Sequence, residues 1–98
     1  MQIDYKNKNI KMSCTDASYA KKKYGNEIAE KIQLRIDQIM AIDSVEQMIK
    51  FKIGRCHPLQ GDRKNQFAVD LIHPYRLVFE KKSKEIQVVT IVEITDYH

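Results

Sequence analysis

The sequence predicts an α+β fold, with N-terminal helices packed on one face of a small antiparallel β-sheet. Two observations give this class. Apolar residues recur every three or four positions through the first half of the chain, as they do on an amphipathic helix. After Gly54 the period changes to two, which is typical of strands. A chain of 98 residues suits one hydrophobic core, so we expect residues 1–98 to form a single domain.

The first half begins with a weakly alternating stretch, residues 1–5, that predicts a short edge strand. A helical pattern then runs from about residue 8 to residue 48. Within it we expect a shorter helix over 15–24, a break and N-cap at Gly25-Asn26, and a longer helix over 26–43. These two helices would form a hairpin. The longer helix carries one apolar stripe, made of Ile28, Ala29, Ile32, Ile36, Ile39 and Met40.

A further short helix is predicted to begin near Asp43-Ser44. Asp43 with Glu46, and Ser44 with Gln47, both have the spacing of a capping box. Gly54 is the expected stop. The helices would therefore all precede the segment that forms most of the sheet.

Three alternating segments predict that sheet, over residues 67–71, 75–80 and 86–94, the last of them longer and largely buried. His73-Pro74 and the segment 81–85 (KKSKE) supply the turns. Connections this short make sequential strands antiparallel. Since the helices cover one face, the other face of the sheet stays open.

Arg76 interrupts an apolar strand. If its neighbours Tyr75 and Leu77 face the helices, its guanidinium lies on the open face. An arginine on a solvent face is common. The alternative is a fixed guanidinium that can hold two phosphate oxygens at once.

The charge of the chain is mixed, with a formal net value of +4. Such a balance permits a polyanionic partner such as nucleic acid, or an acidic protein, without requiring one. No apolar run approaches the length of a membrane span, and the polar first residues contain no signal-peptide core. We therefore expect a cytoplasmic protein with no membrane partner.

The two cysteines, Cys14 and Cys56, are far apart and are expected to be reduced thiols. Cys56 could join His57, His73 and His98 in binding a metal. However, neighbouring residues on a strand point to opposite faces, and neither a Cys-x-x-Cys nor a His-x-x-x-His pair occurs. We therefore expect no metal and no other cofactor.

Polar side chains concentrate in two segments. The first, residues 55–66, combines His57 with Asp62, Arg63 and Lys64 around a glycine. It is either a charged loop before a strand or an anion-binding loop beside a titratable imidazole.

The second polar segment is Asp96-Tyr97-His98. If the strand stays extended, Tyr97 points away from the other two; if the chain turns after Ile94, all three converge. A terminal carboxylate on His98 would favour the protonated imidazole. An imidazole that gains and loses a proton near neutral pH suits general acid-base catalysis, whereas a solvated tail is the alternative.

Together the two segments resemble the RelE/ParE superfamily of bacterial toxins. HPLQGDRKNQFAVDLIHPYRLVFE (57–80), followed by DYH (96–98), is similar to the HigB or killer-protein branch of type II toxin-antitoxin systems. The resemblance implies a RelE-like β-α-α-β-β-β arrangement. It also implies a ribosome-dependent endoribonuclease, an mRNA interferase that cuts translated mRNA through a ribose 2′-OH without a metal. The implied partners are the ribosome, mRNA and a helix-turn-helix, HigA-like antitoxin, through which alone operator DNA would be bound.

The resemblance also implies roles for individual residues. His57 or His98 would transfer protons, and which of them is acid or base stays open. Asp96 would orient an imidazole, Tyr97 would stack or donate a hydrogen bond, and Arg76 would stabilise charge in the transition state. The residues implied to contact RNA are Arg55, Gln60, Arg63 and Lys64.

Two positions depart from the family pattern. Gln60 stands where relatives commonly have lysine; glutamine can hydrogen-bond a phosphate but brings no charge, so activity is either attenuated or compensated by Lys64 or Arg55. Asn65 replaces a frequent glycine.

Two other functions fit the same fold. A ParE-type toxin inhibits DNA gyrase without catalysis, and a binding module of this fold can lack toxicity. The combination of His57 with the DYH segment favours the nuclease.

Overall fold

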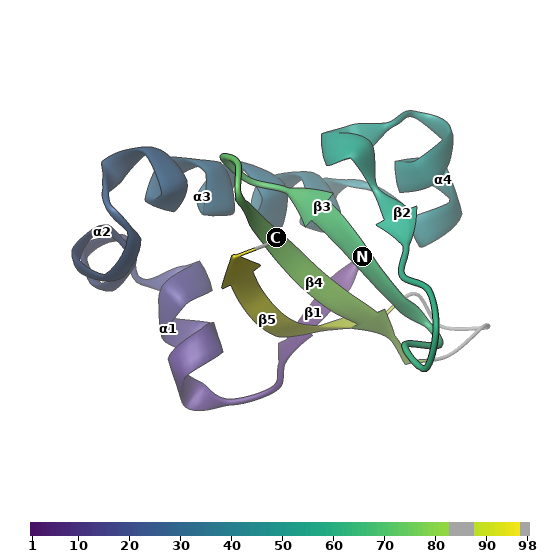
Figure 1. Ribbon diagram of the computed structural model, residues 1–98, viewed down its shortest axis with the longest axis horizontal. Helices are drawn as coiled ribbons and strands as arrows, with labels where there is room; N and C mark the ends of the chain where they lie inside the picture. The colour runs from purple at the N-terminus through teal and green to yellow at the C-terminus, as the bar shows by residue number, and fades with distance from the viewer. Residues whose placement is uncertain (83–87, 97–98) are drawn as a thin grey trace.

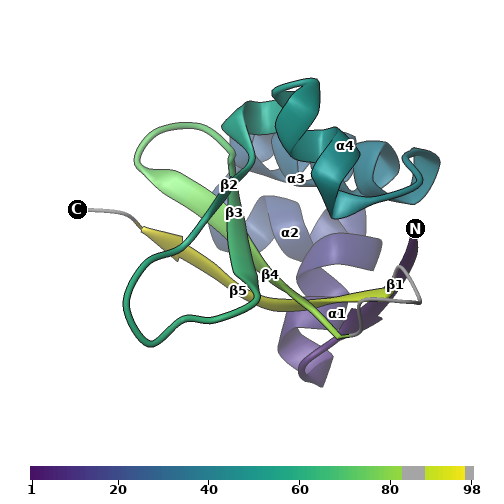
Figure 2. The ribbon, with the colours of Figure 1, turned by 90° about the vertical axis from the view of Figure 1, so that its right-hand side faces the viewer.

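The structure, a computed structural model, describes residues 1–82 and 88–96 (Figure 1). Its helices lie on one side of a five-stranded sheet, which confirms the predicted α+β class (Figure 2). A 3₁₀ turn at Ile53–Arg55 joins the last helix to the second strand. The elements in chain order are β1 (Gln2–Tyr5), α1 (Lys8–Thr15), α2 (Ala17–Tyr24), α3 (Asn26–Ala41), α4 (Val45–Lys50), β2 (His57–Pro58), β3 (Gln66–Asp70), β4 (Tyr75–Lys81) and β5 (Val88–Asp96).

The sheet has the strand order β1-β5-β4-β3-β2, so β1 is an edge strand as predicted. It pairs in parallel with β5, from Gln2 opposite Val88 to Tyr5 opposite Ile91, while the other neighbours are antiparallel. The expectation of a wholly antiparallel sheet was therefore wrong. The argument from short connections does not apply to β1, because four helices separate it from the rest of the sheet.

The helical segment divides differently from the prediction. The chain turns at Asp16, whose N–H donates to the Met12 carbonyl (2.9 Å) at the end of α1. The Asp16 carboxylate accepts from the Tyr19 N–H (3.1 Å) and so caps α2. One aspartate thus ends a helix and begins the next. The break at Gly25 is confirmed, but Gly25 itself is the N-cap and Asn26 is already helical.

The predicted cap of α4 is present at Ser44, whose hydroxyl accepts from the Gln47 N–H (3.1 Å). The Gln47 side chain accepts in turn from the Asp43 N–H (3.2 Å). The helix ends at Lys50, before Gly54, which lies instead in the 3₁₀ turn.

The core forms where α3 meets the sheet. Ile32, Ile36 and Ile39 of the predicted stripe are buried. The sheet residues in the same cluster are Val69, Leu71, Leu77, Phe79, Val89 and Ile91. Met40, also assigned to the stripe, is 61% exposed, so that assignment was wrong. Its neighbour Ile39 already fills the position that faces the core.

β5 contains a bulge that the alternating pattern did not predict. Val78 lies opposite Glu93, but the next residue, Phe79, lies opposite Ile91. Val92 is therefore an extra residue, and the alternation of faces shifts by one beyond it. As a result Ile91 and Ile94 both pack toward the helices, while Thr90 and Glu93 share the open face. Ile86, predicted to begin this strand, lies outside the described residues.

Both cysteines are free thiols, as predicted, and the structure shows that both are buried. Burial raises the pKa of each thiol from 9.0 to about 12. Among residues 1–82 and 88–96, no group of three or more His, Cys, Asp or Glu side chains could hold a metal ion. None of the helices in that part of the chain is both long and apolar enough to cross a bilayer.

The buried thiols give a first testable prediction. At pH 8 a disulfide reagent such as Ellman's should react slowly with the native protein. After denaturation the same reagent should react rapidly with both thiols. Because the folded pKa values exceed the unfolded ones, the two thiols contribute full stability below about pH 9. That contribution should be lost as the pH rises from 9 toward 12. Rapid labelling of the native protein would contradict the burial.

Candidate functional site

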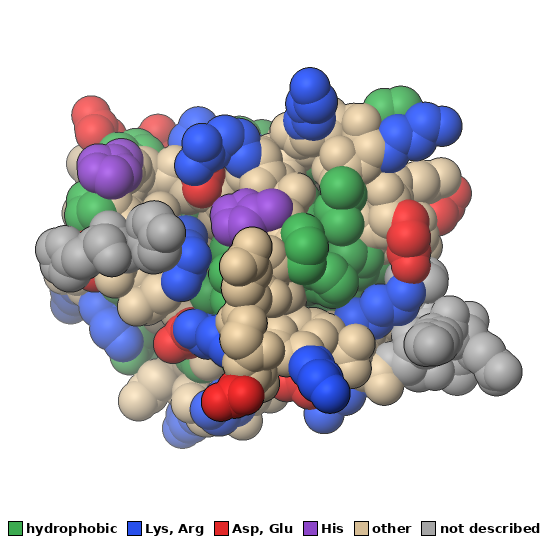
Figure 3. Space-filling view, turned by 45° about the vertical axis from the view of Figure 1, so that its right-hand side comes forward, with side chains coloured by type: hydrophobic (Ala, Val, Ile, Leu, Met, Phe, Trp, Pro, Cys, Tyr) green, Lys and Arg blue, Asp and Glu red, His purple; other side chains and the backbone are tan. Residues whose placement is uncertain are grey.

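The sheet carries two separate hollows that share no lining residue. Figure 3 shows histidine side chains on the surface with Lys and Arg side chains around them. The smaller hollow, here called the His57 cleft, has a volume of about 390 Å³. It is lined by Arg55, His57, Asp70, Leu71, His73, Pro74, Tyr75 and Arg76.

His57 enters the cleft from β2, a strand of two residues that pairs with β3 at Ala68. Its Nδ1 lies 2.8 Å from the Arg55 carbonyl oxygen. A carbonyl oxygen can only accept, so Nδ1 carries the hydrogen. In the neutral imidazole Nε2 is then the nitrogen with a free lone pair, which is the form a general base requires. Cys56, next to it, is buried on the other side of the strand.

The turn before β2 aims the Arg55 carbonyl at His57. Lys52 (φ 56°), Gly54 (φ 56°) and Arg55 (φ 52°) all adopt left-handed backbone, which is unfavourable for lysine and arginine. Backbone of this kind persists only where the surroundings hold it in place, and it clusters at functional sites.

Arg35 of α3 supplies part of that support. Its Nε donates to the Asp70 carbonyl oxygen (2.7 Å), and its Nη1 donates to Gln38 Oε1 (2.9 Å). Burial lowers the pKa of Arg35, while the nearby Asp70 opposes that shift. The Asp70 carboxylate forms an ion pair with Arg55. The helix layer is thereby connected through Asp70 and Arg55 to the imidazole in the cleft.

Gly54 is required in this turn for two reasons, which predict a large effect of Gly54→Ala. A Cβ there would lie 2.7 Å from Arg35 Nε, and the φ of 56° is strained for alanine. Gly61→Ala is the matched control, because Gly61 also has a positive φ (78°) but nothing within 4 Å of its Cβ position. We expect Gly61→Ala to lower the free energy of unfolding by about 1 kcal/mol. Gly54→Ala should cost about 1–2 kcal/mol more, since Arg35 must give up hydrogen bonds.

Chemical denaturation of both variants measures this difference. Equal losses would mean that Arg35 moves aside freely and that the contact above Gly54 does not hold the turn.

Arg76 lies on the open face, as expected. Its neighbour Leu77 is fully buried on the helix side, and Arg76 pairs across the sheet with Asp70 of β3 and Thr95 of β5. The guanidinium is half-buried and lines the cleft with His57. β2, β3 and β4 therefore bring together His57, Asp70 and Arg76 from distant parts of the sequence.

The predicted C-terminal group is only partly described. Asp96 is the last residue of β5, is exposed, and pairs with Tyr75 rather than with Arg76. It is not among the described residues that line the cleft. Tyr97 and His98 lie outside the described residues.

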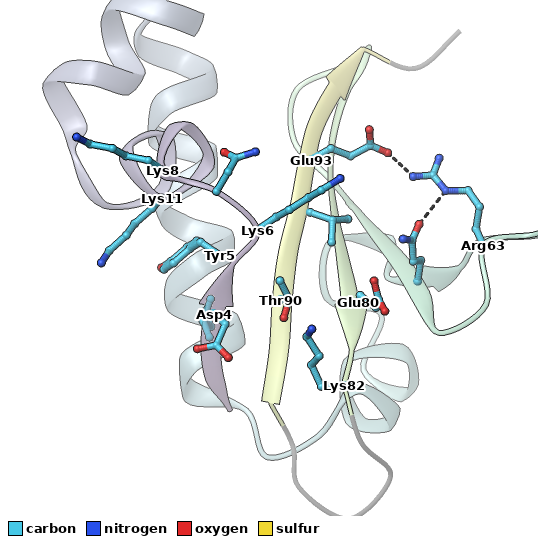
Figure 4. A pocket seen from close by; sticks show the side chains of 14 residues that line it. Asp4, Tyr5, Lys6, Lys8, Lys11, Arg63, Glu80, Lys82, Thr90 and Glu93 are labelled. Carbon is cyan, nitrogen blue, oxygen red and sulfur yellow. Dashed lines mark hydrogen bonds and ion pairs between the residues drawn. The ribbon is translucent and has the colours of Figure 1, made fainter.

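The four residues implied to contact RNA fall into different places. Arg55 lines the His57 cleft, whereas Arg63 lines the second hollow. Arg63 donates to Gln66 Oε1 (2.8 Å) and forms an ion pair with Glu93, so its side chain crosses over β4 (Figure 4). Gln60 and Lys64 are exposed in the β2–β3 loop and line neither hollow. In the same loop Asn65 has a φ of 62°, a conformation that asparagine tolerates in place of glycine.

Among the polar residues that line the cleft, three were not predicted as site residues: Asp70, His73 and Tyr75. Asp70 has a signal in the sequence, since an aspartate ends an apolar strand. Its place beside Arg76 depends on the register of β3 against β4, which the sequence does not reveal. His73 lies in the turn between β3 and β4 and lines the cleft from there.

Comparison with known proteins is informative for the fold. No family model matches the chain, and no curated protein matches it in sequence. Among solved structures, a YoeB/ParE toxin from Agrobacterium tumefaciens is similar, with a TM-score of 0.65 at 15% identity, and the match covers 100% of both chains. The chain therefore has, over its whole length, the fold of a YoeB/ParE toxin.

Proposed function

We propose that this protein is the toxin of a type II toxin-antitoxin system and acts as a metal-independent endoribonuclease on mRNA in the translating ribosome. The observation that supports it most is the His57 cleft. There an imidazole with its Nδ1 hydrogen bonded to the Arg55 carbonyl lies in one hollow with the Arg76 guanidinium. The fold of a YoeB/ParE toxin and the resemblance of residues 57–80 and 96–98 to the HigB branch support the same proposal.

The proposed reaction breaks one P–O bond and makes another. The ribose 2′-oxygen attacks the adjacent phosphorus and loses its proton to a base. The 5′-oxygen leaves and takes a proton from an acid, which yields a 2′,3′-cyclic phosphate and a free 5′-OH. The bound Nδ1 of His57 favours this residue as the base, acting through Nε2. His98 is then the proposed acid, with Asp96 and Tyr97 supporting it.

Arg76 is proposed to bind the phosphate under attack. Negative charge grows on the non-bridging oxygens as the 2′-oxygen approaches, and a fixed guanidinium can donate to two of them at once. Arg55 is proposed to position His57. Its side chain forms an ion pair with Asp70, and its carbonyl oxygen accepts the hydrogen bond from His57 Nδ1.

The proposed partners follow from the resemblance to the HigB branch. A HigA-like antitoxin with a helix-turn-helix would hold the toxin inactive and would carry any contact with operator DNA. The targets would be the ribosome and its mRNA, so the protein would act in the cytoplasm to inhibit growth.

A cell-free translation reaction tests the proposal. Added protein should produce mRNA cuts, mapped by primer extension, that appear only while ribosomes translate and disappear when initiation is blocked. The RNA ends at each cut should be a 2′,3′-cyclic phosphate and a 5′-OH, which identify attack by the ribose 2′-oxygen. Intact mRNA combined with inhibited DNA gyrase supercoiling would refute the nuclease and favour the ParE-type alternative.

A further inference from the structure

The second hollow of the open face, here called the Thr90 groove, is larger than the His57 cleft, with a volume of about 930 Å³. It is formed by β1 and the start of α1 on one side, by β5 and β4 as its floor, and by Arg63 from the β2–β3 loop on the other side (Figure 4). None of its lining residues has a role in the proposed proton transfers.

The floor of the groove is a row of polar side chains on neighbouring strands. Asp4 of β1 pairs with Thr90 of β5, and Thr90 pairs with Glu80 of β4. Glu80 pairs in turn with Gln66 of β3, which completes the row. Carboxylates, a hydroxyl and an amide therefore lie side by side at the bottom of one hollow.

Thr90 is the unusual member of this row. The residue is only 7% exposed, yet its Oγ1 has no hydrogen-bond partner among the described residues. Buried polar atoms are nearly always bonded, so an orphaned hydroxyl needs an explanation. The atom is covered by its neighbours, and Thr90 lines the groove, so a ligand that enters the groove and moves the covering side chains aside can supply the missing partner.

Two lysines stand over this acidic floor. Figure 4 shows that Lys6 reaches across β5 and that Lys82 lies beside Thr90, whereas Lys8 and Lys11 point outward from α1. No ion pair joins Lys6 or Lys82 to a described carboxylate. The groove thus offers ammonium groups for an anion above hydrogen-bond acceptors for N–H or O–H donors.

We propose that the Thr90 groove binds a nucleoside phosphate. The phosphate would lie near Lys6 and Lys82, while ribose hydroxyls or base N–H groups would donate to Asp4 and Glu80. The Thr90 hydroxyl would bond to the same ligand. A bare anion would be repelled by the two carboxylates, and an acidic peptide would be too. A nucleotide carries both kinds of group that the groove accepts.

The position of the groove suggests where that nucleotide comes from. Arg76 and Glu80 are four residues apart on β4, about 13 Å at the usual rise of a strand. A single RNA strand with its scissile phosphate at Arg76 can therefore extend along the open face and place a nearby nucleotide in the groove. This assignment to an RNA strand rests on the proposed function; a free nucleotide is the other source.

NMR titration of ¹⁵N-labelled protein tests the proposal, with His57→Asn as the background so that no substrate is cut. The probes are a ribonucleoside 5′-monophosphate, its 2′-deoxy analogue, inorganic phosphate and a short single-stranded RNA. We expect saturable shifts of the Asp4, Glu80 and Thr90 amides with the ribonucleotide. Thr90→Val should weaken binding by about three- to tenfold, and Thr90→Ser, which keeps the hydroxyl, should retain it.

Charge variants provide a second measurement. Lys6→Gln and Lys82→Gln should each weaken binding, whereas Lys22→Gln on α2, which also removes one exposed positive charge, should leave it unchanged. Phosphate alone that matches the nucleotide in affinity and in shifts would overturn the proposal, and so would unchanged binding by Thr90→Val.

Three further outcomes separate the groove from the proposed function. Binding of the monophosphate but not of the RNA oligonucleotide supports a nucleotide site and overturns its link to an RNA strand. Nucleotide binding by a protein that cuts no mRNA during translation refutes the nuclease and leaves the groove standing. Translation-dependent cleavage by a protein that binds no nucleotide in the groove refutes the nucleotide site and leaves the proposed nuclease standing.

Discussion

His57→Asn should lower translation-dependent mRNA cleavage by about 10²–10⁴-fold, the usual contribution of one general acid-base group. Asparagine places an amide N–H near the position of the imidazole Nδ1, so it can still donate to the Arg55 carbonyl that His57 contacts at 2.8 Å. It has no counterpart of Nε2 and cannot take a proton from the 2′-OH. The variant therefore removes the proposed base while it retains the hydrogen bond that orders the turn.

The rate of cut formation, measured by primer extension over time, gives the size of the effect. Thermal unfolding of His57→Asn should match that of the wild type, which shows that the loss is chemical. His57→Gln is a useful companion, because its amide reaches toward the Nε2 position and should also be inactive. Cleavage by His57→Asn near the wild-type rate would assign the proton transfer to another group.

Arg76→Ala should lower cleavage by about 10²–10³-fold, as expected when one preorganised donor to a developing negative charge is removed. Arg76 is half-buried on the open face, opposite Asp70 of β3 and Thr95 of β5, and it lines the His57 cleft. Arg76→Lys keeps the charge but loses the planar fork, and its rate should lie between those of the wild type and Arg76→Ala.

The control for Arg76 is Lys22→Ala on α2. Both alanine variants lower the net charge by one, so a general weakening of ribosome or RNA attraction would affect them alike. We expect Lys22→Ala to cleave normally. An equal rate for Arg76→Lys and the wild type would show that charge alone matters at this position, and equal losses in Arg76→Ala and Lys22→Ala would remove Arg76 from the reaction.

The parts of the fold that the sequence predicts are those set by local pattern. Ile32, Ile36 and Ile39 lie one helical turn apart, and this spacing was enough to place α3 against the sheet. Asp16 was missed because one residue both ends α1 and caps α2, and an uninterrupted helical pattern conceals such a turn. The parallel pairing of β1 depends on how the chain returns after four helices, which no local pattern reports.

The site was predictable to the extent that strand parity decides it. The sequence places Arg76 on the open face because its neighbours in the strand are apolar. It marks His57 as a candidate because the surrounding segment is rich in polar residues. Asp70 beside Arg76 and the row formed by Asp4, Thr90 and Glu80 require the cross-strand register. That register is a property of the assembled sheet and not of any one segment.

The bulge at Val92 has a consequence for how this strand can change length during evolution or engineering. Beyond it, Ile94 faces the helices and Thr95 lies opposite Arg76, which is the reverse of simple alternation from Thr90. Deleting Val92 would exchange the two faces for every residue that follows, since a shift of one residue turns a strand over. Single insertions and deletions within 91–96 should therefore be poorly tolerated, and compensated pairs should survive. Val92, which has no role in the proposed proton transfers, thus sets which face of the sheet each later residue of β5 occupies.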